Sequence, residues 1–306
     1  MDNSPEGTAG SLHGRTAVVT GGTRGIGAGI ARAFLDAGAA VVVCARRPPE
    51  TPLEGAEFAP LDVCDPAAVR DFFDALPRVD VLVNNAGGAP YRPLADAGPE
   101  RHARVLELNL VAPLTVSLAA YEHLRRTRGA VVMIGSVSGG RPSPGTAAYG
   151  AAKAGLESLA RSMAVEWAPE VRVNTLVVGM VRTESSSLHY GGEDGVAAVA
   201  RTVPLERLAE PSDVGRAAVF LASDAAAAYI TGASLLVHGG GERPAFLDAA
   251  AANRPGTSGT SAQGPPARGR PDSDDLTTSR SVNRSGTNGT LGREDTTCGV
   301  SPTAEQ

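Results

Sequence analysis

The stretch TAVVTGGTRGIG, residues 16–27, decides the fold. Its first five residues form an apolar run of strand length, typical of a strand covered on both faces of a parallel sheet. Three glycines, Gly21, Gly25 and Gly27, then separate this strand from a helical pattern. Such a turn lets the backbone approach a pyrophosphate closely and directs a helix N-terminus at its negative charge. We therefore interpret residues 16–27 as the first βα unit of a dinucleotide-binding sheet.

Strand-length apolar runs continue to alternate with longer helical patterns beyond this unit. We expect strands at 16–20, 40–45, 57–61, 79–84, 130–135, 172–178 and 234–239, and helices at 26–38, 66–76, 99–126, 147–167 and 211–223. Strands separated by helices imply right-handed crossovers between parallel neighbours. The predicted fold class is α/β, with a single Rossmann-type doubly wound parallel sheet of about seven strands and helices on both faces.

Composition divides the chain into three parts. Residues 249–306 contain no aromatic residue and only four large aliphatic ones. Such a segment cannot bury enough apolar surface to offset the entropy lost on ordering it. We predict a flexible N-terminus at 1–10, a catalytic domain at 11–248 and a disordered tail at 249–306; a partner-binding tail is the alternative.

Charge and cysteine content exclude several function classes. The net charge of −5 provides no basic field for nucleic acid or an anionic membrane surface. The three cysteines form no close-spaced pair, so neither a metal site nor a disulfide framework is expected. The N-terminus lacks the features of a secretory signal, and no apolar run approaches the length of a membrane span. We expect a soluble, cytoplasmic protein.

The segment AAYGAAKAG, residues 147–155, places Tyr149 and Lys153 four residues apart in a helical pattern. Positions i and i+4 lie on the same helix face, so the phenol and the ammonium would project together. A phenol titrates near roughly 10, and a neighbouring cation favours the phenolate. By itself the segment is more typical of a surface turn with two ordinary polar residues, because Tyr and Lys at this spacing are common.

The end of the second predicted strand indicates which dinucleotide is bound. An NAD enzyme usually carries Asp or Glu there, whereas this chain has Ala45, Arg46 and Arg47. Arg46 can form charge-assisted hydrogen bonds to a 2′-phosphate, and Arg24 in the glycine turn can approach the same group. We therefore prefer NADP(H), with NAD(H) possible and solvated loop arginines as the alternative.

Five motifs in order resemble those of the short-chain dehydrogenase/reductase family. They are TGGTRGIG at 20–27, NNAG at 84–87, LELNL around Asn109, GSVSG at 135–139 and YGAAK at 149–153. The resemblance covers roughly residues 11–245. Each motif alone is modest, but five of them at suitable spacings are highly specific.

The resemblance implies a role for each catalytic candidate. Tyr149 matches the family's general acid and base, and Lys153 the lysine that binds the nicotinamide ribose and lowers the tyrosine pKa. Ser136, thirteen residues before Tyr149, matches the serine that positions the carbonyl; Ser138 is its competitor. Asn109 matches the asparagine that holds a water in the proton relay.

The resemblance also implies a cofactor cleft and some residues near the substrate. The cofactor candidates are Gly21, Thr23, Arg24, Gly25, Ile26, Gly27, Arg46, Asp62, Val63, Asn85, Ala86, Gly87, Tyr149, Lys153, Gly179, Val181 and Thr183. The chain departs from the family at Val178, where proline is common, and at His238, where aspartate is frequent. We interpret His238 as structural. Substrate contacts are open for His189 and Tyr190, and for Arg141 and Ser143.

These residues predict an NAD(P)-dependent oxidoreductase that interconverts a ketone and a secondary alcohol, in the direction of NADPH-dependent reduction. A 3-oxoacyl thioester is slightly preferred as substrate over a cyclic or steroid-like ketone. The alternative is a dinucleotide-binding sensor or subunit without turnover. The resemblance implies a homotetramer or dimer that pairs through the last strand and the helix carrying Tyr149.

Overall fold

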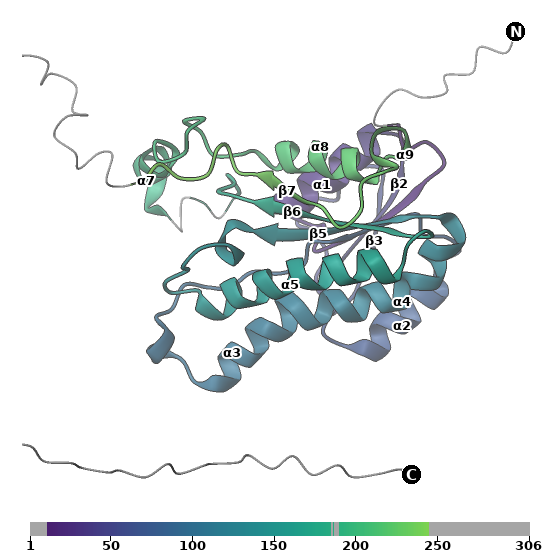
Figure 1. Cartoon of the computed structure of the whole chain (residues 1–306), viewed down its shortest axis with the longest axis horizontal. Helices are drawn as coiled ribbons and strands as arrows, with labels where there is room; N and C mark the ends of the chain where they lie inside the picture. The colour runs from purple at the N-terminus through teal and green to yellow at the C-terminus, as the bar shows by residue number, and fades with distance from the viewer. Residues whose placement is uncertain (1–10, 185, 187–189, 245–306) are drawn as a thin grey trace, which may run out of the picture. The chain divides into compact units, whose positions relative to one another are not determined.

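The computed structural model describes residues 11–184, 186 and 190–244, which form a parallel sheet between two layers of helices (Figure 1). The sheet order is β3-β2-β1-β4-β5-β6-β7, and all neighbours pair in parallel. The predicted doubly wound sheet is confirmed. The strands are β1 (Thr16–Thr20), β2 (Ala40–Ala45), β3 (Ala56–Pro60), β4 (Val81–Asn84), β5 (Ala130–Ser136), β6 (Arg172–Val178) and β7 (Ser234–Val237). The predicted segments 1–10 and 249–306, and His189, lie outside the described residues.

Helices cover both faces of the sheet. On one face lie α1 (Gly25–Asp36), α8 (Pro211–Ala222) and α9 (Asp224–Ala227); on the other lie α2 (Pro66–Ala75), α4 (Ala112–Thr127) and α5 (Ala147–Glu166) (Figure 1). Gly38, with a φ of 88°, follows the C-cap of the first helix in the left-handed conformation that glycine favours at helix ends. Residues 184–210, which interrupt the alternation of strands and helices, contain α7 (Gly192–Ala200).

The single helix expected at 99–126 is divided in the structure. It consists of α3 (Pro99–Leu106), the π-helical turn η2 (Glu107–Val111) and α4. The continuous stretch Pro99–Thr127 is long and apolar enough to meet the criteria for a membrane span. The core helices of soluble proteins meet the same criteria, and α4 packs on the sheet through Val116, Ala120 and Leu124.

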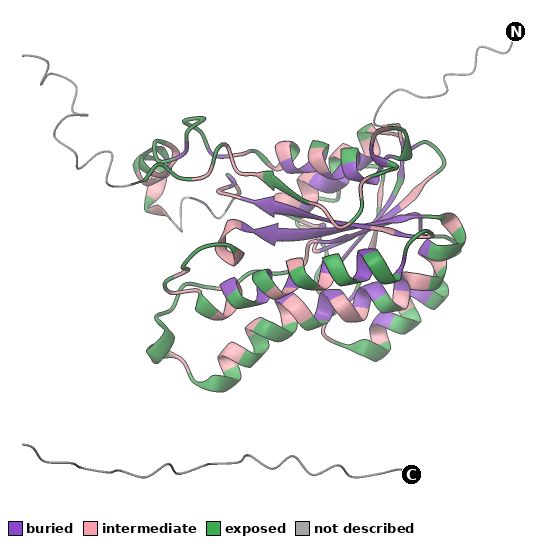
Figure 2. Ribbon diagram, in the orientation of Figure 1, coloured by how far each residue is buried: buried purple, intermediate pink, exposed green. Residues whose placement is uncertain are grey.

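Two hydrophobic cores result from the alternation of side chains along the strands. Val18 and Val42 face α2, α4 and α5, whereas Val19 and Val43 face α1 and α8. Figure 2 shows the central strands as buried between exposed helix surfaces. Burial on both faces requires apolar residues at successive positions, which explains the continuous apolar runs in the sequence.

The amino-terminal edge of the sheet is held by a buried carboxylate, Asp80. Its side chain is inaccessible to solvent and accepts hydrogen bonds from the Arg78 side chain (2.7 Å twice), from the Thr16 N–H (2.9 Å) and from Arg15 Nη1 (3.2 Å). Burial by itself raises the pKa of Asp80, but the hydrogen bonds from Arg78 and Thr16 outweigh it, and the net pKa is lowered. Asp80 therefore joins β1 to the start of β4.

We expect Asp80→Asn to lower the free energy of unfolding by about 3 kcal/mol at neutral pH, because two arginines lose a buried partner. Since the folded-state pKa is lowered, the stabilisation is present above the unfolded carboxyl pKa and is lost as pH falls through the folded value. Urea unfolding as a function of pH measures both effects. The exposed Glu122–Arg125 pair supplies the control, because Glu122→Gln should cost less than about 0.5 kcal/mol. Equal losses in the free energy of unfolding for Asp80→Asn and Glu122→Gln would contradict the stabilising role assigned to Asp80.

Candidate active site

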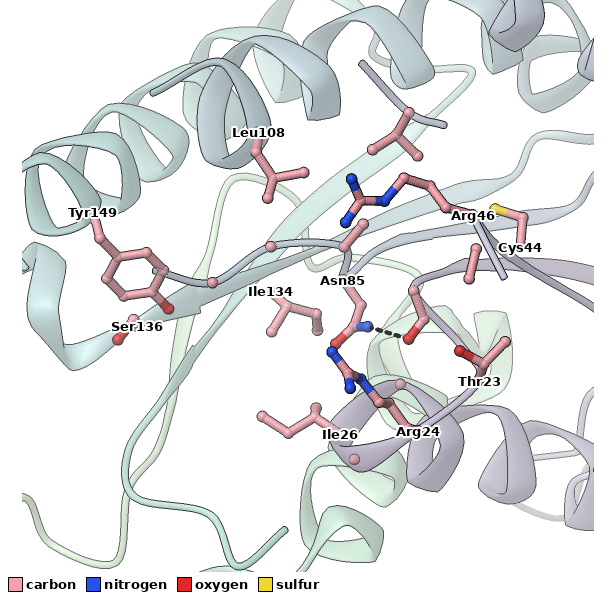
Figure 3. A pocket seen from close by; sticks show the side chains of 18 of the residues that line it. Thr23, Arg24, Ile26, Cys44, Arg46, Asn85, Leu108, Ile134, Ser136 and Tyr149 are labelled. Carbon is pink, nitrogen blue, oxygen red and sulfur yellow. Dashed lines mark hydrogen bonds between the residues drawn. The ribbon is translucent and has the colours of Figure 1, made fainter. Parts of the chain in front are cut away.

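A cavity of about 690 Å³ lies at the carboxyl ends of the central strands. Figure 3 shows Tyr149 and Ser136 at one end and Arg46 and Cys44 at the other, with Asn85 between them. Parallel pairing brings these residues together, because Thr20 lies in register with Cys44 and Ser136 with Val178. The site is therefore elongated, with a phenol at one end and a guanidinium at the other.

The glycine turn is shaped so that its backbone lines this cavity. Gly21 and Gly25 have φ values of 63° and 53°, which glycine adopts without strain. A Cβ on Gly27 would stand only 2.2 Å from the Gly21 carbonyl oxygen. Asn85 Nδ2 donates to the Thr20 and Gly21 carbonyls at 2.9 and 3.1 Å, so β4 holds the turn in place.

The glycine turn leads into the N-terminus of α1, where the first backbone N–H groups have no partner within the helix. The first turn of α1 contains no acidic residue, and the side chain of its N-cap residue, Arg24, forms no capping hydrogen bond. The amide groups and the positive end of the helix dipole can therefore accept an external anion. Together with the close backbone approach at Gly27, this arrangement fits the pyrophosphate of a dinucleotide.

Arginines surround the far end of the cavity. Arg46 follows β2, and its guanidinium points into the cavity together with that of Arg24 (Figure 3). Arg104 and Glu107, from the other helical layer, line the same cavity. No carboxylate follows directly on β2, in agreement with the sequence.

The catalytic candidates meet where β5 ends and α5 begins. Tyr149 lies in the first turn of α5, and its phenol lies beside the side chain of Ser136, the last residue of β5 (Figure 3). Ser136 Oγ accepts a hydrogen bond from the Ser138 N–H at 3.2 Å, which fixes its side chain. Ser138 does not line the cavity, so the geometry selects Ser136 over its competitor.

Lys153 lies one turn further along α5 and is almost fully buried. Its Nζ donates to the Ile134 carbonyl at 2.7 Å and stands 5.5 Å from the centre of the Tyr149 ring. Burial lowers the pKa of Lys153 to about 8, because a buried ammonium loses hydration. The i, i+4 spacing thus places the two groups on one face, as predicted.

The pKa of the tyrosine differs from the sequence-based expectation. Burial raises the pKa of Tyr149, and the hydrogen bond with Ser136 opposes that rise. We expected Lys153 to bring this pKa down. The lysine directs its ammonium at the Ile134 carbonyl, and burial is the dominant influence on the phenol.

Asn109 is fully buried in the π-helical turn η2, and its side chain is saturated by protein groups. Its Oδ1 accepts the Gly88 N–H at 2.8 Å, and its Nδ2 donates to the carbonyls of Gly88 and Val105. These three hydrogen bonds to backbone groups hold the Asn109 side chain in place.

Gly87 separates this asparagine from the lysine. A Cβ at Gly87 would lie 2.6 Å from Asn109 Oδ1 and 3.6 Å from Lys153 Nζ, so both groups border the same small space. The two asparagines of NNAG diverge: Asn85 lines the cavity, whereas Asn84 is buried and donates to Ser117 Oγ at 2.8 Å.

The structure brings together nearly all of the predicted cofactor residues. Those that line the cavity are Gly21, Thr23, Arg24, Gly25, Ile26, Gly27, Arg46, Asp62, Val63, Asn85, Ala86, Gly87, Tyr149, Lys153, Gly179 and Thr183. Val181 does not line it, because it is buried in a bridge with Ala209. Whether each lining residue binds the cofactor stays a prediction.

The remaining candidates lie elsewhere. Arg141 pairs with Glu242, Ser143 bonds to Thr146, and Tyr190 donates to Met180 Sδ. His238 accepts the Gly240 N–H through Nδ1 and does not line the cavity, which agrees with a structural role. None of these four residues lines the cavity that contains Tyr149.

Sequence reasoning missed several lining residues. Ala45, Leu61, Cys64, Gly88 and Gly135 are chain neighbours of predicted residues at strand ends and could have been included. Glu107 and Leu108, in η2, belong to the LELNL motif around Asn109 and could have been included, whereas Arg104, in α3, lies outside that motif. Glu184, next to Thr183, was also missed.

Comparisons with known proteins agree with this geometry. The family model described as "Enoyl-(Acyl carrier protein) reductase" matches residues 21–242. The chain is 38% identical over 244 residues to L-fucose dehydrogenase from Oryctolagus cuniculus, spanning 75% of this chain and 85% of that protein.

Two solved structures extend the comparison. Gluconate 5-dehydrogenase from Burkholderia cenocepacia J2315, in complex with NADP and tartrate, is 30% identical with a TM-score of 0.69 and coverages of 76% and 96%. Ligand-free aldohexose dehydrogenase from Thermoplasma acidophilum is 28% identical with a TM-score of 0.71 and coverages of 75% and 94%. With the Ser136–Tyr149–Lys153 arrangement and the glycine turn, these similarities establish that the chain belongs to the short-chain dehydrogenase/reductase family of NAD(P)-dependent oxidoreductases acting on CH–OH groups.

Proposed function

We propose that the protein interconverts a ketone and a secondary alcohol with NADP(H) in preference to NAD(H). The observation that carries the proposal is that the side chains of Ser136 and Tyr149 lie together beside buried Lys153, in a cavity whose other end holds two arginines (Figure 3). A protein that only bound the dinucleotide would have no physical need for the first of these features.

The chain's own residues divide the chemistry among them. A bound nicotinamide supplies the hydride donor or acceptor. Tyr149 Oη donates a proton to the carbonyl oxygen during reduction and removes it from the alcohol during oxidation. Ser136 Oγ donates a hydrogen bond to the same oxygen as negative charge develops there. Because Ser136 ends β5 and Tyr149 lies in the first turn of α5, both side chains line the cavity at the place where the substrate oxygen must approach.

The groups behind Tyr149 are arranged to replace its proton. Lys153 Nζ and Asn109 Oδ1 border one small space beside Gly87. A water in that space would reach the Lys153 ammonium. The lysine pKa of about 8 suits it to exchange protons near neutral pH.

The arginine end of the cavity supports the preference for NADP(H). Arg46 and Arg24 both point into the cavity, and no carboxylate directly after β2 is available to bind a free 2′-hydroxyl or repel a 2′-phosphate (Figure 3). The NADP in the Burkholderia gluconate 5-dehydrogenase structure is consistent with this preference.

For the substrate class we propose a polyhydroxylated compound such as a sugar or a sugar acid. The support comes from relatives named for L-fucose, gluconate and aldohexoses. The 3-oxoacyl thioesters favoured from the sequence are the second class to test, and the name of the matching family model also refers to an acyl thioester, although to an enoyl one.

We also propose that the protein is a homo-oligomer, either a tetramer or a dimer. Large apolar side chains are exposed on the edge strand β7, at Leu235 and Leu236, and on α5, at Val165. Exposed apolar residues at a sheet edge and on an adjoining helix are typical of a surface that a partner covers.

We expect Tyr149→Phe to lower kcat about a thousandfold, because the variant has no group to exchange the substrate proton. Its affinity for NADPH, measured by calorimetric titration, should remain within about twofold of wild type. A control, Tyr121→Phe, alters a tyrosine that packs on Trp167 outside the cavity and should keep its activity. Unchanged turnover by Tyr149→Phe would refute the mechanism and leave the non-catalytic alternative.

We expect Arg46→Ala to weaken NADPH binding about ten- to a hundredfold, since it removes a charge-assisted hydrogen bond to the 2′-phosphate. NADH binding should change by less than about threefold. Arg47→Ala is the matched control, because Arg47 is the neighbouring exposed arginine and does not line the cavity. Equal losses of NADPH and NADH affinity would overturn the cofactor assignment.

A spectrophotometric panel tests the substrate class. L-Fucose, D-gluconate and D-glucose are offered with NADP⁺ and with NAD⁺, and acetoacetyl thioester is offered with NADPH and with NADH. We expect turnover of at least one of the three polyols and a higher kcat/KM with the phosphorylated cofactor. Turnover of acetoacetyl thioester alone would favour the acyl substrate class instead.

A further inference from the structure

An acidic side chain lies on the glycine turn at the position where an anion is expected. The Gly25 N–H donates to Glu184 Oε1 at 3.4 Å, a contact at the long end of the hydrogen-bond range. A Cβ built on Gly25 would lie 3.7 Å from Glu184 Oε2 and 3.5 Å from Thr183 Cγ2. Glu184 thus reaches the start of α1 from the segment after β6, and it lines the cavity.

The Glu184 carboxylate supplies the negative charge that the first turn of α1 does not contain in its own sequence. No acidic residue occurs in the first turn of α1, and Arg24 forms no side-chain cap there. A negative charge at a helix N-terminus is stabilised by the helix dipole and by the unpaired N–H groups. Glu184 provides that charge across 159 residues of sequence.

The backbone on which Glu184 sits is anchored. Val181 forms a bridge with Ala209, and the Thr183 N–H donates to Ser186 Oγ at 2.8 Å. The carboxylate is therefore held within reach of Gly25 and can leave it by rotating its own side chain. Its exposure to solvent leaves room for that rotation.

We propose that Glu184 acts as an internal competitor for the pyrophosphate site and thereby sets the affinity for the dinucleotide. This inference rests on the dinucleotide binding proposed above. A carboxylate and a pyrophosphate both require the N–H groups at the start of α1, and their charges repel each other at this distance. Binding must displace the carboxylate, and its return favours release of the cofactor.

The test compares Glu184→Gln with wild type by calorimetric titration of NADPH and NADH. Glutamine keeps the length of the side chain and removes its charge, so we expect both dinucleotides to bind three- to tenfold more tightly and NADPH to dissociate correspondingly more slowly. Adenosine 2′-monophosphate, which has no pyrophosphate, should bind wild type and variant equally.

Glu193→Gln is the matched control, because Glu193 belongs to the same segment and pairs with Arg182 at 2.8 Å. It should leave the affinity for both dinucleotides unchanged. The same gain in Glu193→Gln, or an equal gain for adenosine 2′-monophosphate, would indicate a general charge effect and overturn the proposal. Unchanged or weaker dinucleotide binding by Glu184→Gln would also overturn it while leaving the proposed function intact. Failure of the wild-type protein to bind either dinucleotide would overturn both.

Discussion

The site depends on one constraint, which is that all the strands run in the same direction and end at the same edge. Thr20, Ser136 and Val178 are the last residues of β1, β5 and β6. The glycine turn follows the first of these ends and is held there by Asn85, which follows β4. A single antiparallel strand among them would place its terminal residue at the opposite edge. At the opposite edge, the ion pairs of Asp80 with Arg15 and Arg78 stabilise the fold.

Burial accounts for the electrostatics of the catalytic residues. Tyr149 and Lys153 are both shifted toward their neutral forms, the phenol upward and the ammonium downward in pKa. With a pKa of about 8, the lysine keeps most of its charge at neutral pH and can still release a proton. The cost of burying this charge is limited because the Ile134 carbonyl accepts a hydrogen bond from the ammonium.

The sequence predicted the sheet well because strands buried on both faces require continuous apolar runs, and β1, β2 and β6 begin and end where these runs do. The edge strand β3 is less buried, and its position was wrong by one residue. The catalytic residues were predictable because their spacing on α5 is local. The approach of Arg104 and Glu184 depends on packing between distant segments, for which a single sequence contains no signal. The pKa of Tyr149 was wrong in direction because burial cannot be read from spacing.

The π-helical turn has a consequence for the helix on either side of it. One additional residue in a turn advances the following helix by about 100° about its axis. In a regular helix Arg104 and Val116, which packs α4 against the sheet, would stand about 120° apart around the axis. With the additional residue discounted, they stand only about 20° apart. The irregular turn thus brings Arg104, which borders the cavity, onto the same side of the helical rod as the residues that stabilise the fold.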